Sequence, residues 1–528
     1  MSDKIIVKHS SIVINNYTIG ENRSLESNFT LYDRNTYNYY YMGMDYNKVT
    51  KTLIIPRGLD IPYLENTFNC RAKVDKNHDP LELVEPIQLK YLPRDEVQKE
   101  ALQFMTGNSV QYKKNQAKSQ LSVNLNTGKG KTYCSIATAA VYGLRSAIIT
   151  SSIDWLRQWK EFILEYTDTK PGEIYLLSGA PSIQRLLSKG VSKYKFILIS
   201  HSTIKSYGDT YGWDKVSELF KFMKIGLKFY DECHLNFTNM CKIDFYTNTY
   251  KTYYVTATPA RSDSAENRIF QLYFKNIPSI VLFDEEEDPH TRYVAIRYNS
   301  KPSPLDLSKC SNPKYGLDRN KYMSSYIIKN QNFYKMLRIV LDIVLPKGKT
   351  LMYIGNNYAI SVIHEWICEN YPELENEVGI YTSVIPERDK QSQKQKRLIL
   401  STTKSMGAAE DIKGLKCTVV LAEPFKSEVL AKQTLGRTRD KDTMYIEVVD
   451  TGFRQIQKYY YYKKPVFEKY ATDCMEINLT QSELDTRSSR IEKKRDKFLE
   501  EYYAPKIEYI SPFKEYNKDV LISPFKVI

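Results

Sequence analysis

The sequence predicts an α/β protein with two lobes, each built on a parallel sheet, with a small β-rich region before them and a helical, basic region after them. Strand-like apolar runs alternate with helical periods over residues 91–265, and the same alternation returns over residues 325–452. This pattern is typical of parallel sheets that carry helices on both faces. A length of 528 residues is enough for about three or four domains.

Changes of pattern divide the chain into five segments. Short apolar runs separated by turn formers indicate a β-rich accessory domain at the N-terminus, which would bind nucleic acid or a partner. An irregular stretch with an acidic run at 284–288 indicates a linker or small insertion between the lobes. The expected segments are an accessory domain at 1–90, a first lobe at 91–265, a linker at 266–324, a second lobe at 325–452 and a helical C-terminal extension and tail at 453–528.

The charge of the chain favours a polyanionic partner. The formal net charge is +14 and the isoelectric point is near 9.0. A basic surface gains free energy by releasing the counterions around phosphates. A basic protein without such a partner could have the same composition, so charge alone does not decide.

Cysteine usage and hydropathy favour a cytoplasmic protein. None of the eight cysteines forms a CxxC pair, as expected of reduced thiols in a cytosol-like compartment. The N-terminus lacks the apolar stretch of a signal peptide, and no run of about 18 apolar residues would span a membrane. The 43 tyrosines, with abundant Asn, Lys and Ile, are typical of an AT-rich genome and hint at a phage or other virus, whose protein would work in the host cytoplasm.

The strongest local signal is NLNTGKGKTYCSIATAA at 124–140, where an apolar strand enters a glycine-rich turn and a helix follows. Glycines let backbone N–H groups face phosphate oxygens, and the positive end of the helix favours the anion. The competing interpretation is an ordinary turn before a helix, but strand, loop and helix have the order that a phosphate site requires. The lysine would reach the β- and γ-phosphates and the following threonine would hold Mg²⁺. The predicted phosphate-binding residues are Thr127, Gly128, Lys129, Gly130, Lys131 and Thr132.

A second signal, KFYDECHLNF at 228–237, places two carboxylates at the end of a buried strand. In a parallel sheet, ligands bind at the carboxyl ends of the strands. Asp231 would hold Mg²⁺, Glu232 would polarise the attacking water as general base, and His234 would couple the site to the next motif. DECH alone means little, but it follows the glycine-rich loop by about 100 residues, at a strand end.

The third signal is YYVTATPAR at 253–261, in which Thr256 and Thr258 end another apolar run. Their hydroxyls could bond the acidic cluster and report the state of the nucleotide. Taken alone, TATP could be a strand followed by a turn.

The fourth signal is QTLGRTR at 433–439, on an expected helix of the second lobe, with Gln433, Arg437 and Arg439 as candidate catalytic residues. Arginine forms bidentate bonds to phosphate oxygens and stabilises the charge of a phosphoryl-transfer transition state. An arginine pair in a surface salt-bridge network is the alternative.

In order, TGKGKT, DECH, TAT and QTLGR resemble motifs I, II, III and VI of superfamily 2 helicases. The resemblance covers about residues 90–450 and implies two RecA-like lobes, with ATP and Mg²⁺ in a cleft and nucleic acid across the top. It also implies that Gln98, in LPRDEVQKEAL, reads adenine, and that Gly407 and Asp411, in STTKSMGAAEDI, face the nucleotide. Segments 149–159, 199–204 and 351–356 resemble motifs that contact the nucleic-acid backbone.

Within the superfamily, the chain resembles the branch that contains XPB and the phage helicase UvsW. Leu125 stands where most P-loops have Gly or Ala, and the DECH box and the small preceding region fit the same branch. The segments 54–64 and 455–477 resemble phage members. The resemblance implies a motor that remodels branched DNA or R-loops in viral replication, recombination or repair. Its partner would be branched or duplex DNA, or an RNA–DNA hybrid.

One position departs from the family pattern. Asp440 stands where the last arginine of motif VI is usual, and Arg439 would point about 100° away on a regular helix. Arg437 is therefore the stronger candidate for the arginine finger. Alternatives are a transcription-associated motor that releases transcripts, a nucleic-acid-binding scaffold with weak ATPase activity, and a motor subunit that docks a protein partner through the C-terminal ISPFK repeats at 510–514 and 522–526.

Two further segments leave their roles open. The tyrosines at 459–462 could stack on bases, but an aromatic run more often packs one face on a core, and packing is favoured. The basic segment 487–497 also contains acidic residues, so phosphate binding and a solvated helix are equally supported.

Overall fold

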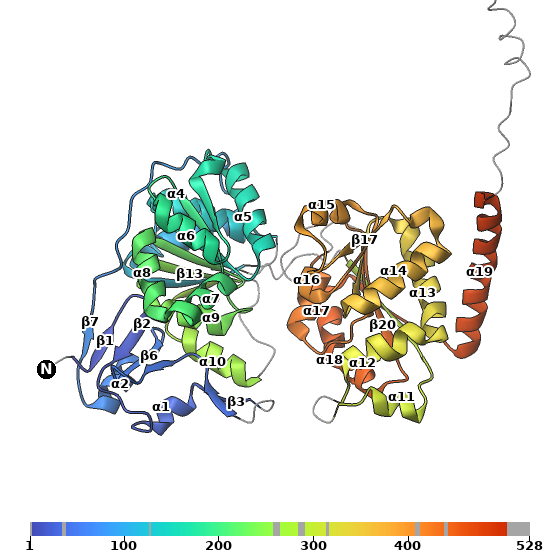
Figure 1. Cartoon of the computed structure of the whole chain (residues 1–528), viewed down its shortest axis with the longest axis horizontal. Coiled ribbons are helices and arrows are strands. Elements are labelled where there is room, and N and C mark those ends of the chain that lie inside the picture. The colour runs from blue at the N-terminus through green and yellow to red at the C-terminus, as the bar shows by residue number, and fades with distance from the viewer. Residues whose placement is uncertain are drawn as a thin grey trace, which may run out of the picture. The chain divides into compact units, whose positions relative to one another are not determined.

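A computed structural model describes most of the chain: residues 3–33, 38–125, 128–256, 264–282, 291–312, 316–406, 412–437 and 442–503. These residues form two compact units (Figure 1). The first runs from the N-terminus to residue 282 and includes Ser427–Arg437, and the second comprises the other described residues from 291 to 503. No helix in the described ranges is long and apolar enough to cross a membrane.

The N-terminal region is a five-stranded sheet with strand order β5-β6-β2-β1-β7, in which only β1 and β7 pair in parallel. A separate two-stranded hairpin, β3–β4, extends from it. The elements are β1 (Ile5–Val7), β2 (Ser11–Ile14), α1 (Arg23–Ser27), β3 (Thr30–Asp33), β4 (Asn38–Tyr41), β5 (Asp45–Asn47), β6 (Thr52–Pro56), α2 (Ile61–Phe68) and β7 (Ala72–Val74). Residues 75–90 then run along the first lobe, where Leu83 and Leu89 make single bridges to it.

The first lobe is built on a seven-stranded parallel sheet with strand order β10-β11-β9-β12-β13-β8-β14. Its strands are β8 (Gln120–Leu125), β9 (Ser146–Thr150), β10 (Ile174–Leu177), β11 (Phe196–Ser200), β12 (Leu227–Asp231), β13 (Lys251–Thr256) and β14 (Ser279–Leu282). Its helices are α3 (Glu96–Thr106), α4 (Lys131–Tyr142), α5 (Ile153–Tyr166), α6 (Ala180–Lys189), α7 (His201–Tyr211), α8 (Trp213–Met223), α9 (Phe237–Tyr246) and α10 (Ser264–Phe274).

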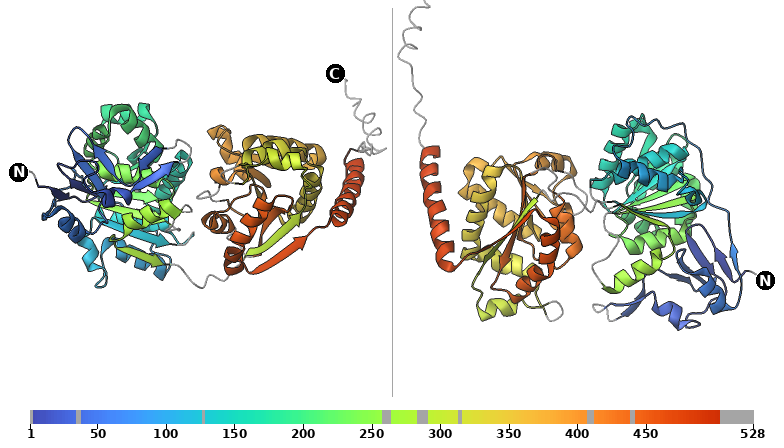
Figure 2. Two further views of the ribbon diagram at one scale, coloured as in Figure 1. Left: turned by 90° about the horizontal axis from the view of Figure 1, so that it is seen from below. Right: turned by 180° about the vertical axis from the view of Figure 1, so that it is seen from behind.

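Successive side chains along a strand point to opposite faces of the sheet, so in the first lobe they pack into two different cores. On β12, Phe229 joins the core under α3, α4 and α5, whereas Tyr230 joins the core under α6 to α10. The second core also contains Ile5, Ile12 and Leu53 of the N-terminal sheet. The N-terminal region is therefore packed into the first lobe through a shared core (Figure 2).

The second unit contains another seven-stranded parallel sheet, with strand order β17-β18-β16-β19-β20-β15-β21. Its strands are β15 (Thr291–Tyr298), β16 (Thr350–Ile354), β17 (Val378–Tyr381), β18 (Leu398–Ser401), β19 (Cys417–Ala422), β20 (Thr443–Asp450) and β21 (Asp473–Asn478). The helices of this part of the chain are α11 (Pro304–Lys309), α12 (Arg319–Lys321), α13 (Gln331–Val344), α14 (Asn357–Asn370), α15 (Glu387–Gln395), α16 (Thr403–Met406), α17 (Glu428–Leu435), α18 (Arg454–Tyr470) and α19 (Gln481–Tyr503).

The α/β class with two parallel sheets is confirmed, but two segments differ from the sequence prediction. The stretch 266–324, expected to be an irregular linker, supplies β14 to the first sheet and β15 to the second. The extension 453–528, expected to be helical, supplies the edge strand β21. Most side chains of β21 are exposed, so its polar sequence DCMEIN does not resemble a buried strand.

The basic segment 487–497 lies on α19. Ion pairs attach this helix to the second lobe. Arg495 makes two bonds to the carboxylate of Glu373 at 2.6 and 2.8 Å, and Arg338 lies 3.1 Å from Glu492. The guanidinium of Arg495 also lies over the ring of Tyr371, 4.2 Å from its centre. At least this arginine of the segment is committed to contacts within the protein.

Candidate nucleotide-binding site

The glycine-rich loop leads from β8 into α4, as the sequence predicts. Gly128 and Gly130 have φ angles of +86° and +88°, a region of backbone space that favours glycine. Gly130 is the N-cap of α4 and offers no side chain to the N–H groups of the first turn, which begins at Lys131. Thr132, the predicted Mg²⁺-binding hydroxyl, is the next residue and is half-buried. An uncapped helix N-terminus of this kind suits a phosphate group.

Gln98 packs against this loop. A Cβ atom on Gly130 would lie 2.1 Å from Nε2 of Gln98, so only glycine fits there without displacing the amide. Oε1 of Gln98 accepts a hydrogen bond from the backbone N–H of Arg94 at 2.8 Å, and the Arg94 guanidinium donates to the carbonyl of Gly128 at 3.3 Å. The side chain of Asp95 caps α3 by accepting from the N–H of Gln98 at 2.9 Å. The segment before α3 is thereby tied to the loop.

Two buried carboxylates stand at the carboxyl end of β12. Lys131 Nζ donates to Oε1 of Glu232 at 2.9 Å, and both side chains are largely buried. The indole N–H of Trp159 donates to Oδ2 of Asp231 at 2.8 Å. Glu232 has a φ of +48°, unusual for a residue with a side chain, at the sharp turn that follows the strand. The loop lysine and the acidic pair thus form one cluster.

The environment perturbs the acidity of Asp231. Burial first, and the adjacent charge of Glu232 second, raise the pKa of its carboxyl to about 6, against the opposing effects of Lys131 and the bond from Trp159. An aspartate with a pKa near 6 can change its charge close to neutral pH, and such groups gather at functional sites.

A chain of hydrogen bonds runs from Glu232 to Gln433. The hydroxyl of Thr256, at the end of β13, donates to Oε2 of Glu232 at 3.2 Å and lies 2.8 Å from Nδ1 of His234. Because that hydroxyl has one proton, these contacts require the proton of His234 to be on Nδ1. Nε2 of His234 is then the acceptor for the amide of Gln433, which lies 3.2 Å away in the segment that groups with the first unit.

The remaining predicted residues divide into two groups. Lys129 lies in the described part of the loop, and Arg437 is buried just after α17. Five others lie outside the described residues: Thr127, Thr258, Gly407, Asp411 and Arg439. The described residues hold no cluster of three or more His, Cys, Asp or Glu side chains that could bind a metal ion by themselves.

The sequence did not identify the role of Trp159. Its indole lies in the apolar stripe of α5, where a tryptophan is read as core, yet its N–H bonds Asp231. Arg94 was missed as well, because a single arginine before a helix carries no specific signal. The clue would be a tryptophan on the helix that follows the strand next to the expected acidic strand end.

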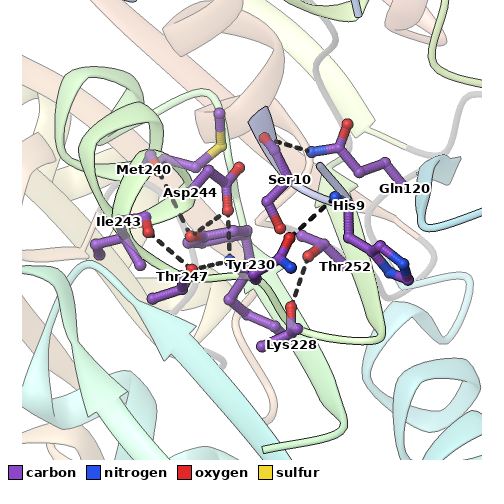
Figure 3. A network of polar contacts seen from close by, with 12 residues as sticks. His9, Ser10, Gln120, Lys228, Tyr230, Met240, Ile243, Asp244, Thr247 and Thr252 are labelled. Atoms are coloured by element: carbon purple, nitrogen blue, oxygen red, sulfur yellow. Dashed lines mark hydrogen bonds and ion pairs between the residues drawn. The ribbon is translucent and has the colours of Figure 1, made fainter. Parts of the chain in front are cut away.

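A fully buried polar cluster gathers around Asp244 and includes Lys228 and Tyr230 of β12 (Figure 3). Lys228 Nζ lies 2.6 Å from Oδ1 of Asp244 on α9, and neither side chain is exposed. The hydroxyls of Tyr230, Tyr254 and Tyr273 also donate to this carboxylate. Burial lowers the pKa of Lys228 and raises the pKa values of the three tyrosines. This cluster, which we call the Asp244 cluster, ties β12, β13, α9 and α10 together.

Comparisons with known proteins agree with this geometry. Residues 92–261 match the family model described as "Type III restriction enzyme, res subunit". A DNA 3'-5' translocase, XPB2 of Sulfurisphaera tokodaii, is 26% identical over 223 residues, which are 41% of this chain and 44% of that protein. The chain therefore aligns with less than half the length of this curated relative.

Among solved structures, Dbp5 of S. cerevisiae bound to RNA and ADP BeF3 superposes with a TM-score of 0.51 and 13% identity, over 76% of this chain and 93% of that chain. At this identity the likeness shows the fold, that of two RecA-like lobes. T4 UvsW covers 90% of this chain and 100% of its own, with 12% identity and a TM-score of 0.34, too low to support an argument. The family match spans the glycine-rich loop and the acidic strand end of the first lobe.

Proposed function

We propose that the protein is an ATP- and Mg²⁺-dependent motor that translocates on DNA and remodels branched DNA or R-loops. The ion pair of Lys131 with Glu232 carries this proposal, because it joins the phosphate-loop helix to the acidic strand end. The match to a DNA 3'-5' translocase supports DNA as the track, and the net charge of +14 supports a polyanionic partner. Viral replication, recombination or repair is the setting that the resemblance implies.

The residues of the site fit ATP as substrate and Mg²⁺ as cofactor. The uncapped first turn of α4 would receive the β- and γ-phosphates, and Gln98 beside Gly130 would hold the adenine. Thr132 and the buried carboxylate of Asp231 would hold Mg²⁺, which when bound neutralises charge on the phosphates. Two protein ligands with phosphate oxygens and water are the usual arrangement for Mg²⁺.

Lys131 and Glu232 would exchange partners when the substrate binds. The phosphate oxygens compete for the ammonium of Lys131, and the released carboxylate of Glu232 becomes free to polarise water as general base. The bond from Thr256 would keep Glu232 in place during this exchange. Arg437 would stabilise the transition-state charge, as could Arg439, since α17 ends at Leu435 and the objection drawn from a regular helix does not apply. Gln433 and His234 would report the nucleotide state to the rest of the chain.

The test is ATP hydrolysis by wild type and Lys131→Ala in the absence of nucleic acid and with duplex DNA, single-stranded DNA, a four-way junction or RNA. Stimulation by branched DNA that is lost in Lys131→Ala is the expected result. Stimulation by RNA alone would replace DNA with an RNA track. Binding of DNA without hydrolysis under any condition would overturn the motor and favour a scaffold.

A further inference from the structure

The β3–β4 hairpin of the N-terminal region exposes a group of tyrosines. The exposed fractions are 45% for Tyr32, 74% for Tyr39, 42% for Tyr40 and 40% for Tyr41. Tyrosine is usually at least partly buried, because its ring contributes a large apolar area to a core. Four exposed rings on one short ribbon therefore indicate a surface that is used for contact.

The strand register places three of these rings on one face. Tyr32 stands opposite Tyr39, and Thr30 stands opposite Tyr41, and directly opposed residues share a face. The rings of Tyr32 and Tyr39 have centroids 4.9 Å apart. On the other face Leu31 is buried and joins the core that the N-terminal sheet shares with the first lobe. One face thus carries the buried Leu31 together with Tyr40, and the other presents Tyr32, Tyr39 and Tyr41 to solvent.

The hairpin has a rigid base. Phe29, Met42 and Met44 at its root are buried, and the N–H of Met42 extends the ladder by donating to the carbonyl of Phe29 at 2.7 Å. A Cβ atom on Gly43 would lie 3.0 Å from Cγ2 of Ile269, which is on α10. The same helix contributes Tyr273 to the Asp244 cluster. A contact surface on such a support keeps its geometry when a ligand binds.

The chemistry of the exposed face favours unpaired bases over an apolar protein partner. Its residues are Tyr32, Tyr39, Tyr41 and the half-buried Thr30, so it offers flat rings and hydroxyls, with no aliphatic side chain. Two exposed guanidinium groups belong to nearby elements. Arg268 on α10 donates to the carbonyl of Ser27, three residues before the hairpin, and Arg23 is on α1, the helix that precedes the hairpin in the chain. Rings that stack bases beside cations that meet phosphates are what single-stranded nucleic acid requires.

The tyrosine run at 459–462 on α18 differs from the tyrosines of the β3–β4 hairpin. Tyr460 is buried, and Arg297 lies 5.6 Å from its ring centre and 5.5 Å from that of Tyr461. Lys426 lies 4.8 Å from the ring centre of Tyr462. Cations of the protein itself contact these rings. The packing that the sequence favoured for this run therefore holds fully for Tyr460 and in part for its neighbours.

From these observations we infer that the face of Tyr32, Tyr39 and Tyr41 stacks the unpaired bases of a single strand, such as the strand that branched DNA exposes. The inference rests on the proposed function, because it assigns the motor's unpaired strand to a surface of the N-terminal region. Each stacked base is worth roughly 5- to 150-fold in affinity, so loss of three rings should weaken single-strand binding by at least about 100-fold.

The experiment compares full-length wild type with two triple variants, Tyr32→Ala/Tyr39→Ala/Tyr41→Ala and the corresponding Phe variant. The dissociation constants of labelled oligo-dT and of a blunt duplex are measured by fluorescence anisotropy without nucleotide. We expect the Ala variant to lose single-strand binding and keep duplex binding, and the Phe variant to keep both, because stacking needs the ring. Tyr63→Ala and Tyr211→Ala, which remove exposed tyrosines elsewhere, control for loss of any surface ring.

Three results would overturn the stacking surface: unchanged oligo-dT binding by the Ala variant, equal losses in the Ala and Phe variants, or equal losses for single strand and duplex. Thermal unfolding checks that the variants fold, and oligo-dT with 5-iodouracil gives a second readout in wild type, since crosslinks should fall within residues 30–41. Because binding is measured without ATP, wild type that binds oligo-dT but never hydrolyses ATP would refute the motor and leave the stacking comparison valid.

Discussion

Two buried lysine–carboxylate pairs in the first lobe differ in how completely their hydrogen-bonding groups are used. In the Asp244 cluster, Lys228 bonds the carboxylate and Thr247, and three tyrosine hydroxyls donate to the same carboxylate. In the site, Lys131 bonds Glu232 and its side chain retains some exposure, while Glu232 also accepts from Thr256. Both pairs belong to the same sheet, since β12 supplies Lys228 and ends immediately before Glu232.

The difference separates a structural pair from an exchangeable one. A buried charge whose partners are all in place stabilises only as long as each partner remains, and removing one leaves an uncompensated charge. A partly exposed lysine beside the carboxyl end of a strand can instead take a ligand as a new partner, because ligands bind at that edge of a parallel sheet. The Asp244 cluster therefore holds β12, β13, α9 and α10 in place, while Lys131 and Glu232 are available for chemistry.

The largest effect is expected for Glu232→Gln. The amide cannot accept a proton from water, so nucleic-acid-stimulated hydrolysis should fall about 100- to 10,000-fold. ATP binding should persist, because Lys131 loses a competitor for phosphate. Steady-state hydrolysis and binding of a fluorescent ATP analogue measure the two effects, with Glu161→Gln on the exposed side of α5 as the charge-matched control. Near-normal hydrolysis would remove Glu232 from the role of general base.

Asp244→Ala should mainly lower the free energy of unfolding. It leaves the ammonium of Lys228 buried without its counter-charge, which costs about 3–5 kcal/mol of the free energy of unfolding. Urea unfolding measures the loss. The double variant Lys228→Met/Asp244→Leu should recover part of it, since an apolar pair needs no compensating charge. If the double variant were less stable than Asp244→Ala, the ion pair itself would not be the source of the effect.

The sequence predicts buried strands well and edge strands poorly. FILIS at 196–200 and the run in β13 are continuous and apolar because both faces of a central parallel strand are covered, and they fold as predicted. The segment of β21 is polar because it lies at an edge, and only its pairing with β15 reveals it as a strand.

Motif spacing likewise predicts the glycine loop and the acidic strand end, because each motif is local in the chain. The partners of Asp244 could not be predicted in this way. Tyr254 and Tyr273 come from a strand and a helix that only the folded sheet brings to α9, and tyrosine and lysine in apolar runs carry no sign of their hydrogen bonds. The bond from Trp159 to Asp231 was missed for the same reason.

Tyr273→Phe makes a smaller change to the Asp244 cluster. It removes one hydroxyl donor and leaves the ring in the core, while Tyr230, Tyr254 and Lys228 continue to bond the carboxylate. We expect a loss of about 1.5–3 kcal/mol, the usual range for a hydrogen bond to a charged group. The same urea unfolding series checks it. A loss as large as that of Asp244→Ala would show that the cluster fails as a unit when any one donor is removed.

The smallest change is expected for Trp159→Phe, and it appears in the pH dependence of hydrolysis. Asp231 must be ionised to hold Mg²⁺, and its pKa of about 6 means that activity should fall as the pH drops through this value. The indole N–H favours the ionised form, so its removal raises the pKa of Asp231 and moves the acidic limb of the pH profile to higher pH.

The pH profile of Trp159→Phe should be recorded at low Mg²⁺, because bound metal favours the ionised carboxylate and masks the shift. Trp213→Phe, which removes a half-buried tryptophan from α8, should leave the limb where it is. A limb that moved to lower pH would mean that the N–H bond is not what keeps Asp231 ionised. A limb that stayed in place in Trp159→Phe would mean that Asp231 is not the group whose charge limits hydrolysis in acid, and the Mg²⁺ role would then have to pass to another residue.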